Sequence, residues 1–93
     1  MNKVVVDWSR TEQEAIAGAL ADSEKPIWMD SATYALVPGN GGLYPERAAE
    51  VYRVLTEIDD ATLRPDVAAA FDDAMAQMRR DLTRQSVSVT VAE

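Results

Sequence analysis

The chain contains neither cysteine nor histidine among its 93 residues. Disulfide bonds and the usual zinc sites need these residues, so neither can reinforce the fold. A hydrophobic core must therefore hold the chain together unaided, which is demanding at this size. Histidine is also the side chain best suited to proton transfer near neutral pH, and cysteine is the strongest nucleophile. Their absence favours a binding protein over an enzyme, and we expect no intrinsic catalytic activity.

The composition predicts one small soluble domain, residues 1–93. Hydrophobic residues make up 47% of the chain and the mean hydropathy is −0.20, which suffices for a core and argues against wholesale disorder. The valines near the start are interrupted by Asp7, far short of a signal-peptide core, and no apolar run approaches the length of a membrane span. We therefore expect a cytoplasmic protein.

Four segments are predicted to be strands: residues 3–8, 27–29, 32–37 and 86–91. The first holds three consecutive valines, which are apolar on both faces as in a central strand. The second and third suit a hairpin that turns at Asp30 and Ser31. The fourth alternates between small polar residues and valines, which indicates a strand with one buried face.

Three helices are predicted between these strands. Ser9 and Glu12 fit a capping box, which starts a helix that runs to about Asp22. Pro45 and Pro65 each suit a first helical position, and the acid that follows each of them complements the helix dipole. The two later helices each carry an apolar face: Ala48, Val51, Leu55 and Ile58 in one, and Val67, Phe71, Ala74, Met78 and Leu82 in the other.

The predicted order of elements is β-α-β-β-α-α-β. If the last two helices are taken as one broken helix, the order becomes the split βαβ arrangement of ferredoxin-like domains. The sequence therefore predicts a single α+β domain with a ferredoxin-like sheet. The alternative is a related antiparallel sheet with helices on one face.

Few patterns in the chain point to a catalytic, cofactor or metal site. The glycine-rich loop at residues 38–42 precedes a helix, as phosphate cradles do, but it lacks the lysine and spacing of a P-loop. A connector is the favoured interpretation. Glu57, Asp59, Asp60 and Asp66 do not follow the spacing of a calcium-binding EF-hand loop. We predict no catalytic residue, no cofactor and no metal site.

Acidic residues outnumber basic ones by sixteen to nine, which gives a net charge of −7. This excess argues against direct binding to nucleic acids or anionic membranes. Much of it lies in residues 57–73, where Arg64 is the only basic residue. The predicted partner-binding residues, named here the acidic stretch, are Glu57, Asp59, Asp60, Asp66, Asp72 and Asp73. The alternative is that these acids only keep the chain soluble.

Trp28 is a further candidate for partner binding, because tryptophan often anchors protein interfaces. If Ile27 and Met29 point inward from an edge strand, Trp28 is exposed on the open face of the predicted sheet. The alternative is that it fills the small core.

These features favour a small acidic inhibitor that occupies the basic, nucleic-acid-binding surface of a target protein. Carboxylates spaced along helices can stand in for phosphates, and complementary charge speeds the encounter. In composition and size only, the chain is similar to phage-encoded anti-defence proteins. An immunity protein or antitoxin would use the same physics on a basic toxin. A homo-oligomeric structural or regulatory module is the third possibility, with a homodimer formed through the edge of the C-terminal strand.

Overall fold

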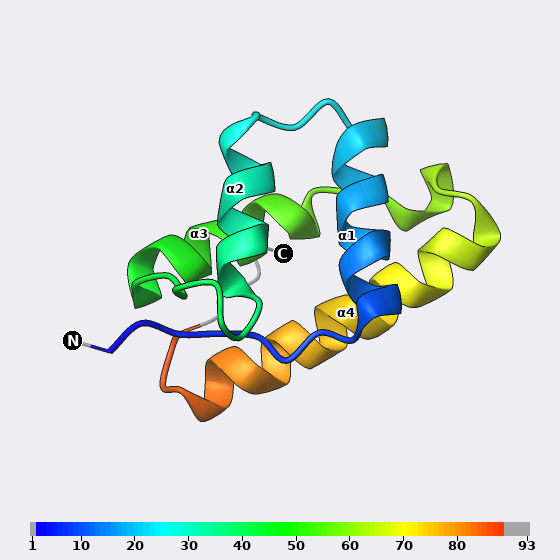
Figure 1. Ribbon diagram of the computed structural model, residues 1–93. Coiled ribbons are helices and arrows are strands. Elements are labelled where there is room, and N and C mark those ends of the chain that lie inside the picture. Colours follow the sequence, from blue (N-terminus) through cyan, green and yellow to red (C-terminus); the bar gives the residue numbers. More distant parts are fainter. Residues whose placement is uncertain (1, 89–93) are drawn as a thin grey trace.

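The computed structural model describes residues 2–88, and this part of the chain is mainly helical (Figure 1). Its elements are α1 (Arg10–Asp22), α2 (Trp28–Leu36), α3 (Pro45–Thr56), the short 3₁₀ helix η1 (Asp60–Thr62) and α4 (Pro65–Arg84). In this range the only β pairing is an isolated antiparallel bridge between Val4 and Leu43. The predicted α+β, ferredoxin-like domain is therefore wrong, and so is the alternative antiparallel sheet.

The three predicted helix starts are confirmed. The Ser9 hydroxyl accepts a hydrogen bond from the Glu12 amide at 3.2 Å, and the Glu12 carboxylate accepts one from the Ser9 amide at 2.8 Å. Both partners of the capping box are thus in place at the start of α1. Pro45 and Pro65 stand in the first turns of α3 and α4. Local chemistry fixes these starts, which is why they can be predicted without tertiary information.

The predicted hairpin of residues 27–29 and 32–37 is instead helix α2. Its buried residues are Met29, Ala32, Thr33 and Leu36, which are spaced as one face of a helix. The Thr33 hydroxyl donates to the Met29 carbonyl at 2.9 Å, so this polar side chain is satisfied within the helix. Burial of this face outweighs the β propensity of Trp28, Thr33 and Tyr34.

The predicted central strand, residues 3–8, is an extended segment without a neighbouring strand. On one side Val4 exchanges two backbone hydrogen bonds with Leu43, at 2.7 and 3.0 Å. On the same side the Val6 amide donates to the Leu36 carbonyl at 2.8 Å. The partners on this side are therefore the end of α2 and the loop that follows it.

On its other side the same segment binds side chains of α4 and of the residue that ends it. The Gln85 amide group accepts from the Val5 N–H at 3.1 Å and donates to the Val5 carbonyl at 2.7 Å. It thus takes the place that a peptide group of a neighbouring strand would fill. The Asp7 N–H donates to the Asp81 carboxylate at 2.8 Å. An extended segment can therefore form backbone hydrogen bonds on both of its sides without a sheet.

The chain reverses after α4 rather than continuing into a strand. Ser86 has a left-handed backbone, with φ of 65°, and its amide donates to the Thr83 carbonyl at 3.0 Å. The Val87 amide donates to the Leu82 carbonyl at 2.9 Å, which completes a Schellman motif. The strand prediction for residues 86–91 is wrong for 86–88, and Val89 to Val91 lie outside the described residues. The homodimer through this strand stays a prediction.

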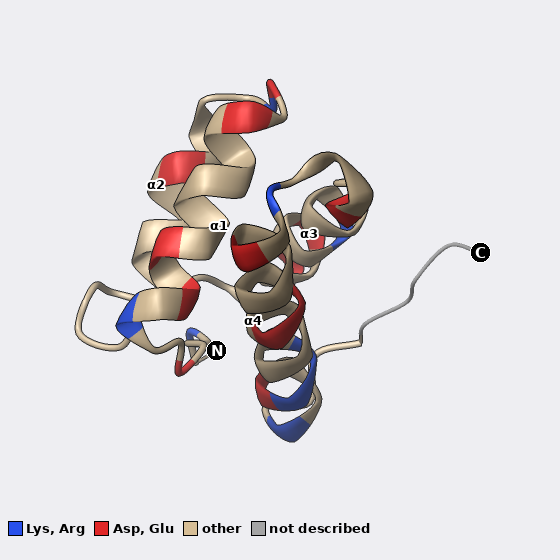
Figure 2. Cartoon of the chain, turned by 90° about the vertical axis from the view of Figure 1, so that its right-hand side faces the viewer, with Lys and Arg blue, Asp and Glu red and all other residues tan. Residues whose placement is uncertain are grey.

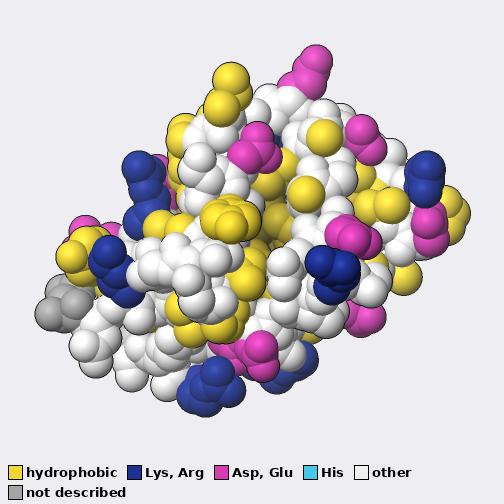
Figure 3. All heavy atoms as spheres, viewed as in Figure 1, with side chains coloured by type: hydrophobic (Ala, Val, Ile, Leu, Met, Phe, Trp, Pro, Cys, Tyr) yellow, Lys and Arg dark blue, Asp and Glu magenta, His cyan; other side chains and the backbone are white. Residues whose placement is uncertain are grey.

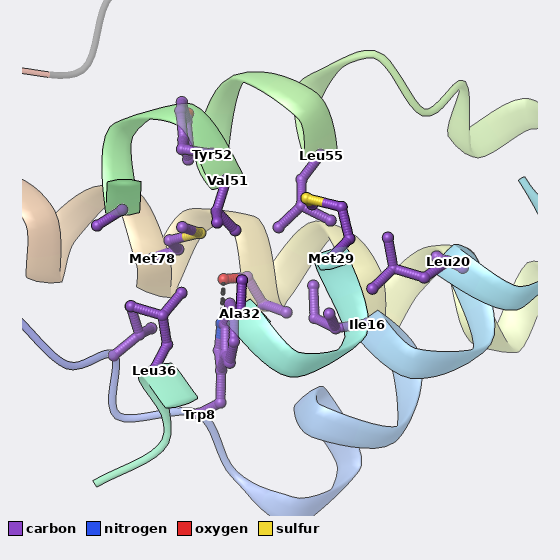
Figure 4. Packing of buried hydrophobic residues seen from close by; sticks show 14 of the residues in the cluster. Trp8, Ile16, Leu20, Met29, Ala32, Leu36, Val51, Tyr52, Leu55 and Met78 are labelled. Carbon is purple, nitrogen blue, oxygen red and sulfur yellow. Dashed lines mark hydrogen bonds between the residues drawn. The ribbon is translucent and has the colours of Figure 1, made fainter. Parts of the chain in front are cut away.

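The core lies where the four helices and the extended segment meet (Figure 4). α1 packs chiefly on α4, and α3 contacts both α2 and α4. Each helix contributes fully buried or nearly fully buried side chains, including Ile16, Met29, Leu36, Val51, Leu55, Met78 and Leu82. Both apolar faces predicted for α3 and α4 point inward, with Val67 half-buried. None of the helices in residues 2–88 has the length and apolar character that a membrane span needs.

Candidate functional site

The acidic stretch lies over the end of α3, over η1 and over the first half of α4 (Figure 2). Asp60 is half-buried, and the other members are exposed: Glu57, Asp59, Asp66, Asp72 and Asp73. The last turns of α4 carry the opposite charge, with Arg79, Arg80 and Arg84 (Figure 2). The molecule is therefore acidic at one end of α4 and basic at the other.

Two members of the acidic stretch are paired with basic side chains. Glu57 lies 3.2 Å from the Lys25 ammonium group, and Asp66 lies 3.2 Å from the Arg64 guanidinium group. The hydrogen bond and the positive charge of Arg64 hold the pKa of the Asp66 carboxyl below its ordinary value. Asp66 also stands in the first turn of α4, where the helix dipole favours it. These two acids offer a partner less uncompensated charge than the sequence suggested.

Asp60 lies close to Asp72 although the two are twelve positions apart in the sequence. A side-chain hydrogen bond, which needs a proton on one of the two carboxyl groups, raises the pKa of the Asp72 carboxyl above its ordinary value, and partial burial and the negative charges of Asp60 and Asp73 act in the same direction. Two carboxyl groups are thus held close together between η1 and α4. The uncompensated part of the acidic stretch is centred on this pair.

Asp72→Asn is expected to stabilise the protein at neutral pH. Because the folded-state pKa of Asp72 is raised, the native state binds its proton more tightly than the unfolded state. Stability from this group is present below its unfolded pKa and is lost as the pH rises through the folded pKa. The gain of the variant should be at most about 1 kcal/mol, since the side chain faces water.

Urea unfolding of wild type and Asp72→Asn at neutral pH and below about pH 3.9 checks this expectation. The difference in the free energy of unfolding should vanish at the lower pH. A difference that is independent of pH would mean that repulsion at Asp72 is not its source.

Asp59 has a structural role of its own. Its carboxylate accepts a hydrogen bond from the Ala61 amide at 3.0 Å and so caps η1. The Asp59 carbonyl accepts from the Thr62 hydroxyl at 2.6 Å. Substitution of Asp59 would therefore mix stability with binding. Asp72 and Asp73 are the cleaner probes of the acidic stretch.

Trp28 lies in a helix and not on an open sheet face. It is the first residue of α2 and is half-buried against the core. The Arg47 guanidinium group of α3 lies over its ring, 4.5 Å from the ring centroid. This cation–π contact links α2 to α3. It leaves less of the Trp28 side chain accessible to a partner than predicted.

The described residues offer few groups for catalysis or metal binding. Within residues 2–88 no three acidic side chains converge closely enough to hold a metal ion. In the glycine-rich loop, the Gly42 amide donates to the Ala35 carbonyl at 2.8 Å and the Asn40 amide to the Val37 carbonyl at 3.1 Å. These amides bind within the chain, as expected of a connector rather than a phosphate cradle.

A groove between α1 and α2 is a second candidate site, which the sequence analysis missed. Its volume is about 350 Å³, and its apolar lining includes Trp8, Ile16 and Ala17. Figure 3 shows apolar side chains at the bottom of this hollow between the two helices. Glu14 lines it from α1, and Asp30 and Tyr34 line it from α2. We name it the α1–α2 groove.

The groove depends on helix α2, and the sequence analysis predicts strands for residues 27–29 and 32–37. The signal was the helical spacing of Met29, Ala32 and Leu36, which leaves Asp30 and Tyr34 on another face. The acidic stretch and the groove share no residue, so the molecule presents two separate candidate surfaces. Compared with known proteins, the chain matches no family model, no curated protein and no solved structure.

Proposed function

We propose that this protein is a small inhibitor that binds the basic, nucleic-acid-binding surface of a target protein through its acidic stretch. The proposal includes a cytoplasmic location, where proteins that process nucleic acids act. The contact surface would be centred on Asp60, Asp72 and Asp73, with Asp59 beside them. Exposed carboxylates on adjacent elements would take the places of phosphates along a nucleic-acid strand.

The observation that carries the proposal is the gathering of acids over η1 and the first half of α4, where most of them are exposed (Figure 2). Asp60 lies close enough to Asp72 to raise the pKa of the Asp72 carboxyl, through a side-chain hydrogen bond first and through burial and negative charge after it. Acids that serve solubility alone work as well when they are spread apart, and like charges in contact cost stability. A basic partner would relieve this repulsion, so part of the binding free energy would come from the pair itself.

The test is the double substitution Asp72→Lys with Asp73→Lys. Wild-type protein is immobilised, proteins captured from a bacterial lysate are identified, and the affinity of each purified partner is then measured. The double variant should bind at least tenfold more weakly, which is about 1.4 kcal/mol. Raising the salt concentration should mainly slow association of the wild type, because exposed charges are screened over about 8 Å at physiological ionic strength. Added DNA or RNA should compete for the partner.

Asp22→Lys with Glu24→Lys is the matched control. Both residues are exposed, and the change in net charge is the same, but they lie at the end of α1, outside the acidic stretch. This control should bind the partner nearly as well as the wild type. Equal losses in the two double variants would mean that only net charge matters. Normal binding by Asp72→Lys with Asp73→Lys would refute the proposal.

A further inference from the structure

The α1–α2 groove exposes apolar surface that the fold itself does not cover. Tyr34, which lines the groove, is 68% exposed, and Ile27, the N-cap residue of α2, is 86% exposed. Large apolar side chains that are exposed this far are a feature of interaction surfaces when they lie beside an apolar groove. On the α1 side the lining includes Ala17, which is exposed and small. Its short side chain leaves room for a side chain of a partner.

The floor of the groove is rigid. The Trp8 indole N–H donates to the Ala74 carbonyl of α4 at 2.8 Å, and the side chain is 4% exposed (Figure 4). Ile16 beside it is almost fully buried in the core. Because the apolar floor is already ordered, little conformational entropy is lost there on binding. Most of the free energy from burying a partner's side chain would then contribute to affinity.

The charges around the groove indicate the kind of partner. Glu14 and Asp30 line it, and neither belongs to any ion pair found within residues 2–88. Arg10 is the one basic residue of the lining, so the lining has an acidic excess. A second copy of the chain carries a net charge of −7 as a whole, so long-range repulsion opposes its approach. The groove therefore suits a basic partner.

We propose that the α1–α2 groove is a docking site for a basic amphipathic helix of a partner protein. Apolar side chains of that helix would lie on Trp8, Ala17 and Tyr34, and its lysines or arginines would face Glu14 and Asp30. The volume is near the lower end for small-molecule pockets, about 300–1,000 Å³, and it suits one or two anchor side chains of an open-ended guest. This proposal does not rest on the function proposed above.

The test uses a Trp28→Phe background, so that the fluorescence of Trp8 reports on the groove alone. The probe is a synthetic leucine–lysine peptide of about four helical turns, with leucines at i, i+3, i+4 and i+7. A leucine–glutamate peptide of the same pattern and a shuffled leucine–lysine peptide are the controls. Only the patterned leucine–lysine peptide should change the Trp8 emission and bind as a helix.

Ala17→Glu separates an apolar groove from simple charge attraction. This exposed position tolerates a helix former, and the change makes the protein more acidic while placing a charge on the apolar lining. Docking in the groove predicts at least tenfold weaker binding, whereas charge attraction alone predicts tighter binding. Glu14→Gln with Asp30→Asn should also weaken binding at least tenfold. Asp22→Asn with Glu24→Gln removes the same charge from exposed positions outside both the groove and the acidic stretch and should leave the affinity unchanged.

Each contrary outcome would overturn the docking proposal. If the peptide fails to bind, or the shuffled peptide binds equally well, the groove does not recognise an amphipathic helix. If Ala17→Glu binds normally, or if the Asp22 and Glu24 variant loses as much as the Glu14 and Asp30 variant, the groove does not hold the peptide. A concentration-dependent dimer in sedimentation that Ala17→Glu abolishes would assign the groove to a second copy of the chain.

Discussion

Asp81→Ala is expected to lower the free energy of unfolding by about 3 kcal/mol. Asp81 is fully buried, and its Oδ2 accepts hydrogen bonds from the Asp7 backbone N–H at 2.8 Å and from the Gln77 side chain at 3.0 Å. Its Oδ1 forms an ion pair with Arg84 at 2.8 Å. Alanine would leave the Asp7 N–H without an acceptor and open a small cavity. In a chain of this size the melting temperature should fall by more than about 10 °C.

Two further variants separate the parts of this interaction. Asp81→Asn can keep an oxygen for the Asp7 N–H and the Gln77 side chain but presents an amide N–H to Arg84, so it should cost less than alanine. Arg84→Ala should cost about 1–3 kcal/mol, because it leaves the buried Oδ1 of Asp81 without its partner. Hydrogen exchange at the Asp7 amide should speed up most in Asp81→Ala. If this exchange is unchanged, Asp81 does not hold the extended segment on α4.

Local chemistry explains which parts of the fold could be predicted from the sequence. The capping box at Ser9 and the prolines at positions 45 and 65 act within one helical turn, and all three helix starts are confirmed. Helix α2 has no side-chain cap. Trp28, Thr33 and Tyr34 favour strands. The helix was therefore indicated only by the spacing of Met29, Ala32 and Leu36 and by the helix propensity of these three residues.

The extended segment shows a second limit of sequence analysis. Its extended backbone and the burial of Val4 and Val6 follow from the run of valines. The sequence around them does not tell whether the backbone partner is a strand or a set of side chains. The indication lies near the other end of the chain. Asp81 and Gln85 follow Met78 at helical spacing, so they continue the buried face of α4 to its C-cap. Polar residues on such a face need partners inside the fold.

The candidate sites, like the fold, could be predicted only where neighbours in sequence determine them. The acidic stretch is exposed as expected, apart from the half-buried Asp60. The pairing of Asp66 with Arg64 could be expected from neighbours in sequence, whereas that of Glu57 with Lys25 depends on tertiary structure. The proximity of Asp60 to Asp72 also depends on tertiary structure. The α1–α2 groove depended on a helix that was not predicted.

Gly42→Ala is expected to destabilise the protein by about 3 kcal/mol. Gly42 has a φ of +73°, which L-residues rarely adopt and which costs them about 1–2 kcal/mol. A Cβ atom there would also lie 2.9 Å from the Val4 carbonyl oxygen and 3.0 Å from the Lys3 Cβ. The nearest obstacle is backbone, so the extended segment would have to shift. That shift would weaken the adjacent hydrogen bonds between Val4 and Leu43.

Two other glycine-to-alanine variants isolate the clash from the backbone strain. Gly41 has a φ of +105° but open space around it, so Gly41→Ala should cost only the strain and fall between wild type and Gly42→Ala. Gly18 lies within α1 with nothing near its missing Cβ, so Gly18→Ala should stabilise the protein by about 0.5–1 kcal/mol. Thermal melts should therefore rank Gly18→Ala above wild type, then Gly41→Ala, then Gly42→Ala. Equal melting temperatures for Gly41→Ala and Gly42→Ala would mean that the contact between the extended segment and Gly42 adds nothing, because the φ of Gly41 lies further from the left-handed helical region and its backbone strain should be no smaller.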